Sequence, residues 1–145
     1  MPKPHVLFVC TANSARSQMA EAFLRQRVGG AGDRFESCSA GTEPSVVNPL
    51  TIKALEQVGI DSTPLWSKGL DEFLGKVRLD YVITVCDNAA QSCPNVPDPD
   101  AEILHWPFED PAATTGSQDD RLAEFARIRD LIDVRIGRWV ESLDA

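Results

Sequence analysis

The sequence predicts an α/β fold in which a parallel sheet carries helices on both faces. Short apolar runs alternate along the chain with longer segments whose apolar residues recur at helical spacing, the pattern of strand–helix–strand units. The run at 79–85 is rich in β-branched residues, which indicates a buried parallel strand. The 145 residues are expected to form a single domain, 1–145, without a linker or an internal repeat.

The first half of the chain predicts strands and helices in alternation. In chain order these are a strand, a helix, a strand and a helix, at 5–9, 17–28, 35–40 and 49–58. A run rich in glycine ends the first helix. Pro49 begins the second helix at a position that tolerates proline, and Gly59 ends it. We expect Ile52, Leu55 and Val58 to form its inner face.

The second half predicts two further strands and a long final helix. The expected elements are a short helix, a strand, a short helix, a strand and a long helix, at 70–76, 79–85, 87–93, 103–106 and 119–143. In the last helix apolar residues recur every three or four positions, so one face is expected to be buried. That face comprises Leu122, Phe125, Ile128, Ile132, Ile136, Trp139 and Leu143.

The composition narrows the possible partners and the compartment. The chain is acidic, with a formal net charge of -8, and contains four cysteines. The charge argues against nucleic acid or an anionic membrane as a partner. The sequence has neither a signal-peptide pattern nor an apolar run of membrane-spanning length, so we expect a cytoplasmic protein. In that compartment cysteines are more often reactive thiols than structural disulfides.

A strand, a tight loop and a helix start meet after Cys10, and this junction is the strongest functional signal. Backbone N–H groups in the first turn of a helix lack intrahelical partners, so a loop of small residues can direct them at one tetrahedral oxyanion. Arg16 adds a charged fork for two anion oxygens. The same positive potential favours the thiolate of Cys10, a nucleophile to which Ser14 and Ser17 can donate. The expected oxyanion-binding residues are Thr11, Ala12, Asn13, Ser14, Ala15, Arg16 and Ser17.

The stretch from Val6 to Glu21 resembles the active-site loop of low-molecular-weight protein tyrosine phosphatases. It is more similar still to the thioredoxin-coupled arsenate reductases that share their fold, and the similarity covers nearly the whole chain. The resemblance implies a low-molecular-weight phosphatase-like, four-stranded parallel sheet in the order 2-1-3-4. Ala12 and Ala15 depart from the family's usual Gly and Cys. Ala12 requires the loop backbone to avoid a strongly positive φ there, or to tolerate it at a cost.

Two further cysteines lie where thiol exchange with Cys10 is feasible. Cys86 ends the third strand as Cys10 ends the first. If these strands are neighbours, about 4.8 Å apart, both cysteines lie within the roughly 4.4–6.8 Å that separates bonded Cα atoms. Cys93 follows seven residues later, and across a helix the rise is about 10 Å, so a Cys86–Cys93 disulfide requires this segment to unwind. The alternative is that Cys86 and Cys93 are unrelated thiols that exchange no disulfide. Cys38 is expected to be a core residue.

The resemblance assigns these thiols an order in the reduction of arsenate to arsenite. Val85-Cys86 with Cys93-Pro94 is similar to the second and third cysteines of the reductases. It implies that Cys10 attacks arsenate, that Cys86 attacks Cys10 and releases arsenite, and that Cys93 takes over the disulfide for reduction by thioredoxin. NADPH supplies electrons through thioredoxin reductase, without a bound cofactor or metal. A glutaredoxin or a low-molecular-weight thiol is the alternative reductant.

The same resemblance implies a monomer that acts in arsenic detoxification, with phosphate and sulfate as competing anions.

The general acid is expected at Asp110, because displacing oxide from arsenate needs a proton. The segment 105–112 is similar to the family's acid loop, in which the Asp before a Pro is the acid. Pro111 restricts Asp110 to extended geometry. Glu109 is the second candidate for the general acid. The alternative is that Asp110-Pro111 forms an ordinary turn before a helix and has no catalytic role.

Some reductases of this family hold a potassium ion near the loop. Asn13, Glu21 and Ser39 match three positions of that site, whereas the fourth, acidic in those relatives, is Lys68 here. An ammonium group at that position replaces the cation rather than coordinating it. We therefore expect no dependence of activity on potassium.

Two other functions stay open at this point. A tyrosine phosphatase would share the loop and Asp110. However, the residues after Asp110 and those at 43–48 offer no aromatic walls for phosphotyrosine, and its reaction needs neither Cys86 nor Cys93. A non-enzymatic oxyanion or redox sensor would use the cysteines without needing Asp110.

Overall fold

The computed structural model describes residues 4–28, 35–86 and 100–144. The helix expected at 87–93 lies outside these residues, and so does Cys93. Within the described ranges no helix is both long and apolar enough to cross a membrane.

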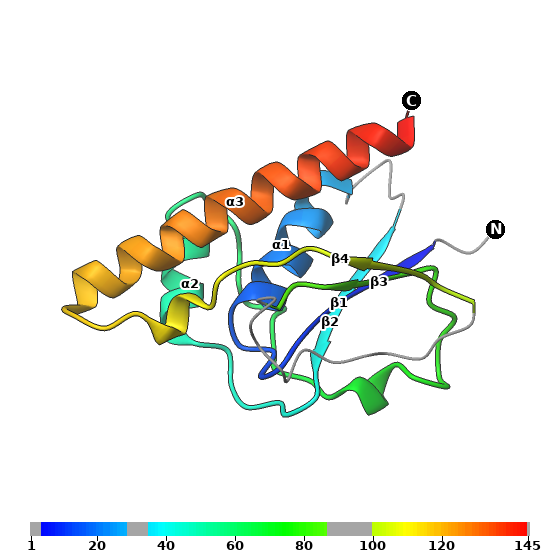
Figure 1. Ribbon diagram of the computed structural model, residues 1–145, viewed down its shortest axis with the longest axis horizontal. Coiled ribbons are helices and arrows are strands. Elements are labelled where there is room, and N and C mark those ends of the chain that lie inside the picture. Colours follow the sequence, from blue (N-terminus) through cyan, green and yellow to red (C-terminus); the bar gives the residue numbers. More distant parts are fainter. Residues whose placement is uncertain (1–3, 29–34, 87–99, 145) are drawn as a thin grey trace.

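Four parallel strands form one sheet in the order β2-β1-β3-β4 (Figure 1). They are β1 (His5–Cys10), β2 (Glu36–Gly41), β3 (Tyr81–Thr84) and β4 (Glu102–His105). The predicted α/β class and strand order are confirmed. The register pairs Cys10 with Gly41 and Val9 with Thr84, so the C-terminal ends of three strands meet at one edge. Ligand sites of parallel sheets lie at this edge.

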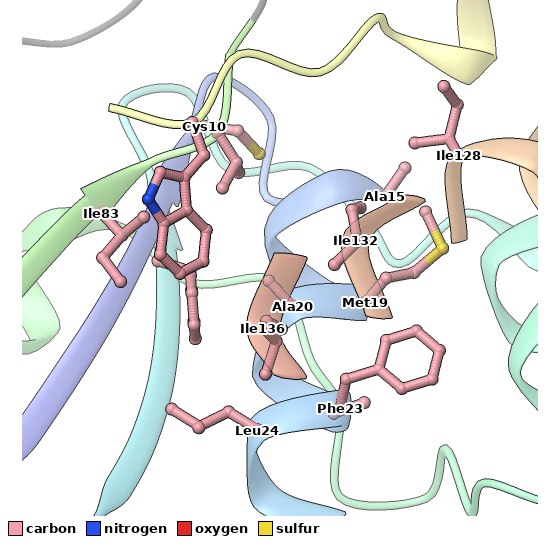
Figure 2. Close-up of a cluster of buried hydrophobic side chains, with 14 of the residues drawn as sticks. Cys10, Ala15, Met19, Ala20, Phe23, Leu24, Ile83, Ile128, Ile132 and Ile136 are labelled. Carbon is pink, nitrogen blue, oxygen red and sulfur yellow. The ribbon is translucent and has the colours of Figure 1, made fainter. Parts of the chain in front are cut away.

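Among the described residues, three α-helices lie on one side of the sheet: α1 (Arg16–Val28), α2 (Pro49–Glu56) and α3 (Gln118–Asp144). α1 lies between the sheet and α3, which crosses over it (Figure 1). Figure 2 shows Ile132 and Ile136 of α3 beside Met19 and Ala20 of α1, with Cys10 at the edge of the same cluster. The core therefore extends directly to the start of the loop that follows β1.

The first turns of α1 are buried on every side. Residues 15–24 are all buried, because the sheet covers one side of the helix and α3 another. Four of them are polar, namely Arg16, Ser17, Gln18 and Glu21. Buried polar groups need hydrogen-bond partners. Ser17, Gln18 Nε2 and Glu21 find theirs around the loop after β1, and Arg16 donates to the Phe108 carbonyl. The apolar residues of this helix predicted one buried inner face. In the structure its polar residues are buried as well.

α3 buries the face that its sequence predicts. Phe125, Ile128, Ile132, Ile136 and Trp139 are buried, and Leu122 and Leu143 pack against the same cluster.

The opposite face of the sheet is covered, among the described residues, by a 3-10 turn η1 (Leu70–Glu72) and the apolar residues that follow it. The helix expected at 70–76 is therefore shorter than predicted. Gly75 adopts a positive φ of 76°, a conformation that does not continue a right-handed helix.

The inner face predicted for α2 is partly wrong. The helix ends at Glu56, and Val58 is 42% exposed. Gly59 follows with a positive φ of 76°, which turns the chain so that Ile60 is buried instead. Asn48 caps the helix through its side chain, which accepts the Leu50 N–H at 2.9 Å.

Candidate active site

The oxyanion loop, residues 11–15, joins β1 to α1 at the C-terminal edge of the sheet. In the described part of the chain, Asn13 is the non-glycine residue with a positive φ, at 48°. Asparagine tolerates this conformation better than most residues. Ala12 avoids a positive φ, as its Cβ requires, so alanine fits this loop without backbone strain.

Cys10 lies at the base of the oxyanion loop and is only 2% exposed. Its Sγ is 2.8 Å from Ser17 Oγ, and Asn13 Nδ2 donates to the same hydroxyl at 2.8 Å. Because Ser17 accepts from Asn13, its own hydrogen is available for the sulfur. The arrangement therefore places a hydrogen-bond donor against the sulfur that is expected to act as the nucleophile.

A buried polar network lies behind the oxyanion loop. Asn13 Nδ2 also donates to Ser39 Oγ at 2.9 Å, and Ser39 donates to Glu21 Oε1 at 2.7 Å. Lys68 Nζ lies 3.4 Å from the same carboxylate oxygen, while the Lys68 N–H donates to Asn13 Oδ1 at 2.8 Å. Arg25 Nη2 reaches the other oxygen of Glu21 at 2.6 Å. The four positions aligned with the potassium site thus come together, with an ammonium group against the carboxylate.

Sequence reasoning missed the residues that support the loop from outside. Gly41 ends β2 so close to it that an added Cβ would lie 2.3 Å from the Thr11 carbonyl oxygen. The Ala12 carbonyl accepts from Ser67 Oγ at 3.0 Å and from the Ser45 N–H at 3.2 Å. A glycine at the end of a strand was the one available signal, since glycine often marks a close backbone approach.

Gln18 is a second support that sequence reasoning missed. Its side chain is fully buried, and Nε2 lies 3.0 Å from the Asn13 carbonyl oxygen and 2.7 Å from the Trp66 carbonyl oxygen. On the other side of the loop, the Ser14 carbonyl accepts from the Asn48 N–H at 3.0 Å. Backbone groups of the oxyanion loop are therefore held both by α1 and by the residue that caps α2.

Arg16 joins the oxyanion loop to the acid loop, residues 106–110. Its side chain is nearly buried, and Nη1 donates to the Phe108 carbonyl at 3.0 Å. Nη2 lies 3.9 Å from Asp110 Oδ2. The bond from Nη1 leaves Nε and Nη2 as donors for an anion, which suits bidentate recognition.

Asp110 and Glu109 point to different partners. Asp110 Oδ1 accepts the Ala112 N–H at 3.0 Å and caps the 3-10 turn η2 (Pro111–Ala113), while its other oxygen faces Arg16. Glu109 is 71% exposed and pairs with Arg127 on α3 at 3.0 Å. Asp110, rather than its neighbour, therefore lies beside Arg16, the arginine that is expected to bind the anion.

Cys86 is fully buried just beyond β3, at the same edge as Cys10. The Val85 N–H donates to the Val9 carbonyl at 2.9 Å, and Cys86 Sγ lies 3.8 Å from that same oxygen. This carbonyl belongs to the residue that precedes Cys10, so the two cysteines lie close together at the ends of adjacent strands. The position of Cys93 relative to Cys86 stays a prediction.

Cys38 lies on the opposite face of the sheet, in an apolar cluster with Leu7, Val9 and Val82. Burial raises the pKa of its thiol from 9.0 to about 12, and the charge of Glu21 adds to the shift. Such a thiol is almost entirely protonated at neutral pH. This environment confirms Cys38 as a core residue.

The chain matches a family model described as low molecular weight phosphotyrosine protein phosphatase over residues 5–145. An arsenate reductase of Halalkalibacterium halodurans is 39% identical to it over 142 residues, 98% of this chain and 99% of that protein. An arsenate reductase of Bacillus cereus strain Q1 is 43% identical over 140 residues, 97% of this chain and 96% of that protein.

Solved structures extend this similarity to the fold. A thioredoxin-dependent arsenate reductase of Corynebacterium glutamicum matches with a TM-score of 0.72 and 29% identity, over 99% of this chain and 63% of that chain. An arsenate reductase in an oxidized state matches with a TM-score of 0.74 and 29% identity, over 95% of this chain and 97% of that chain. An arsenate reductase in a phosphate binding state matches with a TM-score of 0.72 and 28% identity, over 96% of this chain and 98% of that chain.

Proposed function

Because the chain belongs to the low molecular weight phosphotyrosine protein phosphatase family, we propose that it reduces arsenate to arsenite with Cys10 as the nucleophile. Relatives named arsenate reductase align with 97–98% of its length. The observation that carries the proposal is the buried Cys10 thiol at the base of the oxyanion loop, 2.8 Å from the Ser17 hydroxyl. This loop suits a tetrahedral oxyanion, and arsenate is one.

In the first step Cys10 Sγ forms a bond to arsenic while one oxygen leaves as water. Arg16 and the N–H groups of the loop hold the remaining oxygens. Asp110 gives its proton to the leaving oxygen. The 3.9 Å between Arg16 Nη2 and Asp110 Oδ2 supports this assignment, because it brings the acid to the group that binds the anion.

In the second step Cys86 attacks Cys10 Sγ. The sulfur–arsenic bond breaks, its electron pair stays on arsenic, and arsenite leaves with a Cys10–Cys86 disulfide formed. Cys93 then attacks Cys86, which frees Cys10 and produces a Cys86–Cys93 disulfide. The location of Cys86 Sγ, 3.8 Å from the carbonyl oxygen that precedes Cys10, supports the second step.

A dithiol protein of the thioredoxin type reduces the Cys86–Cys93 disulfide, with NADPH as the electron source through thioredoxin reductase. A structural relative described as thioredoxin-dependent supports this reductant. Phosphate and sulfate compete with arsenate, and a relative described in a phosphate binding state supports this competition. We assign the reaction to a monomer that binds no cofactor. It acts in the cytoplasm, where the reaction removes arsenate.

The test is arsenate-dependent NADPH oxidation with thioredoxin and thioredoxin reductase. Wild type should turn over, whereas Cys93→Ser should give at most one stoichiometric burst and Cys10→Ser no reaction. Cys38→Ala is the matched control, because it removes a buried thiol on the other face of the sheet. We expect it to retain wild-type turnover.

Two results would instead favour the alternative functions. Hydrolysis of aryl phosphates that is indifferent to Cys93, together with no arsenate turnover, would identify a phosphatase. Thiol oxidation by arsenate that is unchanged in Asp110→Asn and never catalytic would identify a sensor.

A further inference from the structure

The acid loop is held from two sides by arginines of different helices. On the side of the oxyanion loop, Arg16 Nη1 binds the Phe108 carbonyl at 3.0 Å. On the other side, Arg127 Nη2 of α3 lies 3.0 Å from Glu109 Oε2. The next residue in the chain is Asp110. Each of the two residues before the acid is therefore bonded to a cation, one through its backbone and one through its side chain.

Arg127 is itself held in place on α3. Its Nε donates to both carboxylate oxygens of Glu124 at 3.1 Å, and Nη2 approaches Oε1 at 2.5 Å. Hydrogen bonding to Glu124 raises the pKa of Arg127, and the same bond lowers the pKa of Glu124. The guanidinium is thus a fixed cation between a carboxylate of its own helix and one of the acid loop.

The segment around Glu109 is anchored at both ends, and Asp110 is also held by the cap that it forms on η2. Pro107 and Pro111 flank the segment and have no N–H to donate. Trp106 anchors the start of the loop, where its N–H donates to the Thr84 carbonyl at 2.8 Å. Buried Pro111 anchors the end. Between these anchors, the arginine contacts to Phe108 and Glu109 act directly on the part of the loop that carries the acid.

We infer that Arg127 is a positioning residue for the general acid, acting on Asp110 through Glu109. The inference rests on the proposed function, because it assigns Arg127 to the step in which Asp110 protonates the leaving oxygen. In the part of the chain that the structure describes, Arg127 bonds to Glu124 and Glu109 and to no residue of the oxyanion loop. Its loss should therefore slow the chemical step without weakening the anion site.

The experiment compares kcat/KM for arsenate with the inhibition constant of inorganic phosphate, which reports on anion binding by the oxyanion loop and Arg16 and needs no proton from the acid. Arg127→Ala should lower kcat/KM about two- to fivefold, the range that an exposed ion pair supports. The phosphate inhibition constant should change less than twofold. Arg127→Lys should recover part of the rate, because it restores the charge but not the planar fork.

Arg27→Ala is the matched control. It removes an exposed arginine that pairs with Asp133 of α3 at 2.9 Å and has no part in the acid loop, so its kcat/KM should stay near wild type. Glu109→Gln tests the link from the other end and should resemble Arg127→Ala. If Glu109→Gln fell as far as Asp110→Asn, Glu109 would itself be the acid and the inference would be wrong.

The decisive arm repeats Arg127→Ala in an Asp110→Asn background. A residue that acts by positioning Asp110 has nothing left to position there, so no further loss is expected. The same loss in both backgrounds, or a parallel loss of phosphate affinity, would overturn the inference. No effect of Asp110→Asn would refute the proposed acid. A large effect of Asp110→Asn with none of Arg127→Ala would refute the positioning role alone.

Discussion

Lys68 Nζ lies 3.4 Å from Glu21 Oε1, and both side chains are more than nine-tenths buried. The ammonium group also donates to the Trp66 carbonyl at 2.7 Å and lies 5.0 Å from the centre of the Trp66 ring. Removing one partner of a buried ion pair typically lowers the free energy of unfolding by about 3–5 kcal/mol. The charge of Lys68 therefore stabilises the buried carboxylate behind the oxyanion loop.

The first prediction is that activity does not depend on potassium. Exchange of sodium for potassium at fixed ionic strength should leave kcat/KM for arsenate unchanged, because Lys68 already places a positive charge beside Glu21. Lys68→Asp should make the melting temperature sensitive to the choice of cation, since it puts a second carboxylate there. A rise in wild-type activity with potassium would contradict the prediction.

The second prediction concerns the hydroxyl that faces Cys10. Ser17→Ala removes the donor 2.8 Å from the sulfur, so alkylation of Cys10 by iodoacetamide at pH 7 should slow about tenfold, because hydrogen bonds to charged groups contribute roughly 1.5–3 kcal/mol. Ser37→Ala is the matched control. It removes a buried hydroxyl that donates to the Glu21 carbonyl at 2.9 Å, away from the thiol. Equal alkylation rates in the two variants would refute the role of Ser17.

The third prediction is that Gly41 accepts no side chain. Gly41→Ala would place its Cβ 2.3 Å from the Thr11 carbonyl oxygen and 2.9 Å from the Asn13 nitrogen, both backbone atoms of the oxyanion loop. We expect a loss of about 1–3 kcal/mol in unfolding free energy and a much weaker affinity for phosphate.

Gly137→Ala is the control for this variant. Its Cβ would meet only the end of the flexible Arg27 side chain, at 3.0 Å. Calorimetry and phosphate titration compare the two, and a Gly41→Ala variant that binds phosphate like wild type would contradict the prediction.

The fourth prediction is a loss of stability at alkaline pH that depends on Cys38. In the folded protein burial raises the pKa of this thiol from 9.0 to about 12. Between these values the unfolded chain loses the proton and the folded chain keeps it, so folding becomes less favourable as pH rises. Each pH unit in this window costs up to about 1.4 kcal/mol. Chemical denaturation at pH 8 and pH 10 should therefore show a smaller decrease for Cys38→Ala than for wild type.

The strand and helix positions follow from local patterns, and so does the contact of Cys10 with Ser17. Those residues lie within one strand–loop–helix unit, where spacing fixes geometry. Gly41 and Ser67 escaped prediction because their contacts with the loop depend on how distant segments pack. Gln18 lies only five residues after Asn13 and was missed because it is a polar residue that is nevertheless fully buried.

Two errors have the same local origin. The exposure of Val58 and the short turn at 70–72 both reflect glycines with positive φ, at 59 and 75, which end regular structure earlier than apolar spacing suggests. The partnership of Glu109 with Arg127 depends on the path of the acid loop over α3, which a pattern of residue types does not specify.

The bond from Arg16 to the Phe108 carbonyl has a consequence for the affinity of the site for anions. An arginine side chain that is free in solution carries about 2 kcal/mol of rotamer entropy. In this protein the Phe108 carbonyl already holds the guanidinium, and Nε and Nη2 stay as donors for an anion. Binding an anion therefore orders little more of this side chain, and most of that entropy is lost on folding rather than on binding.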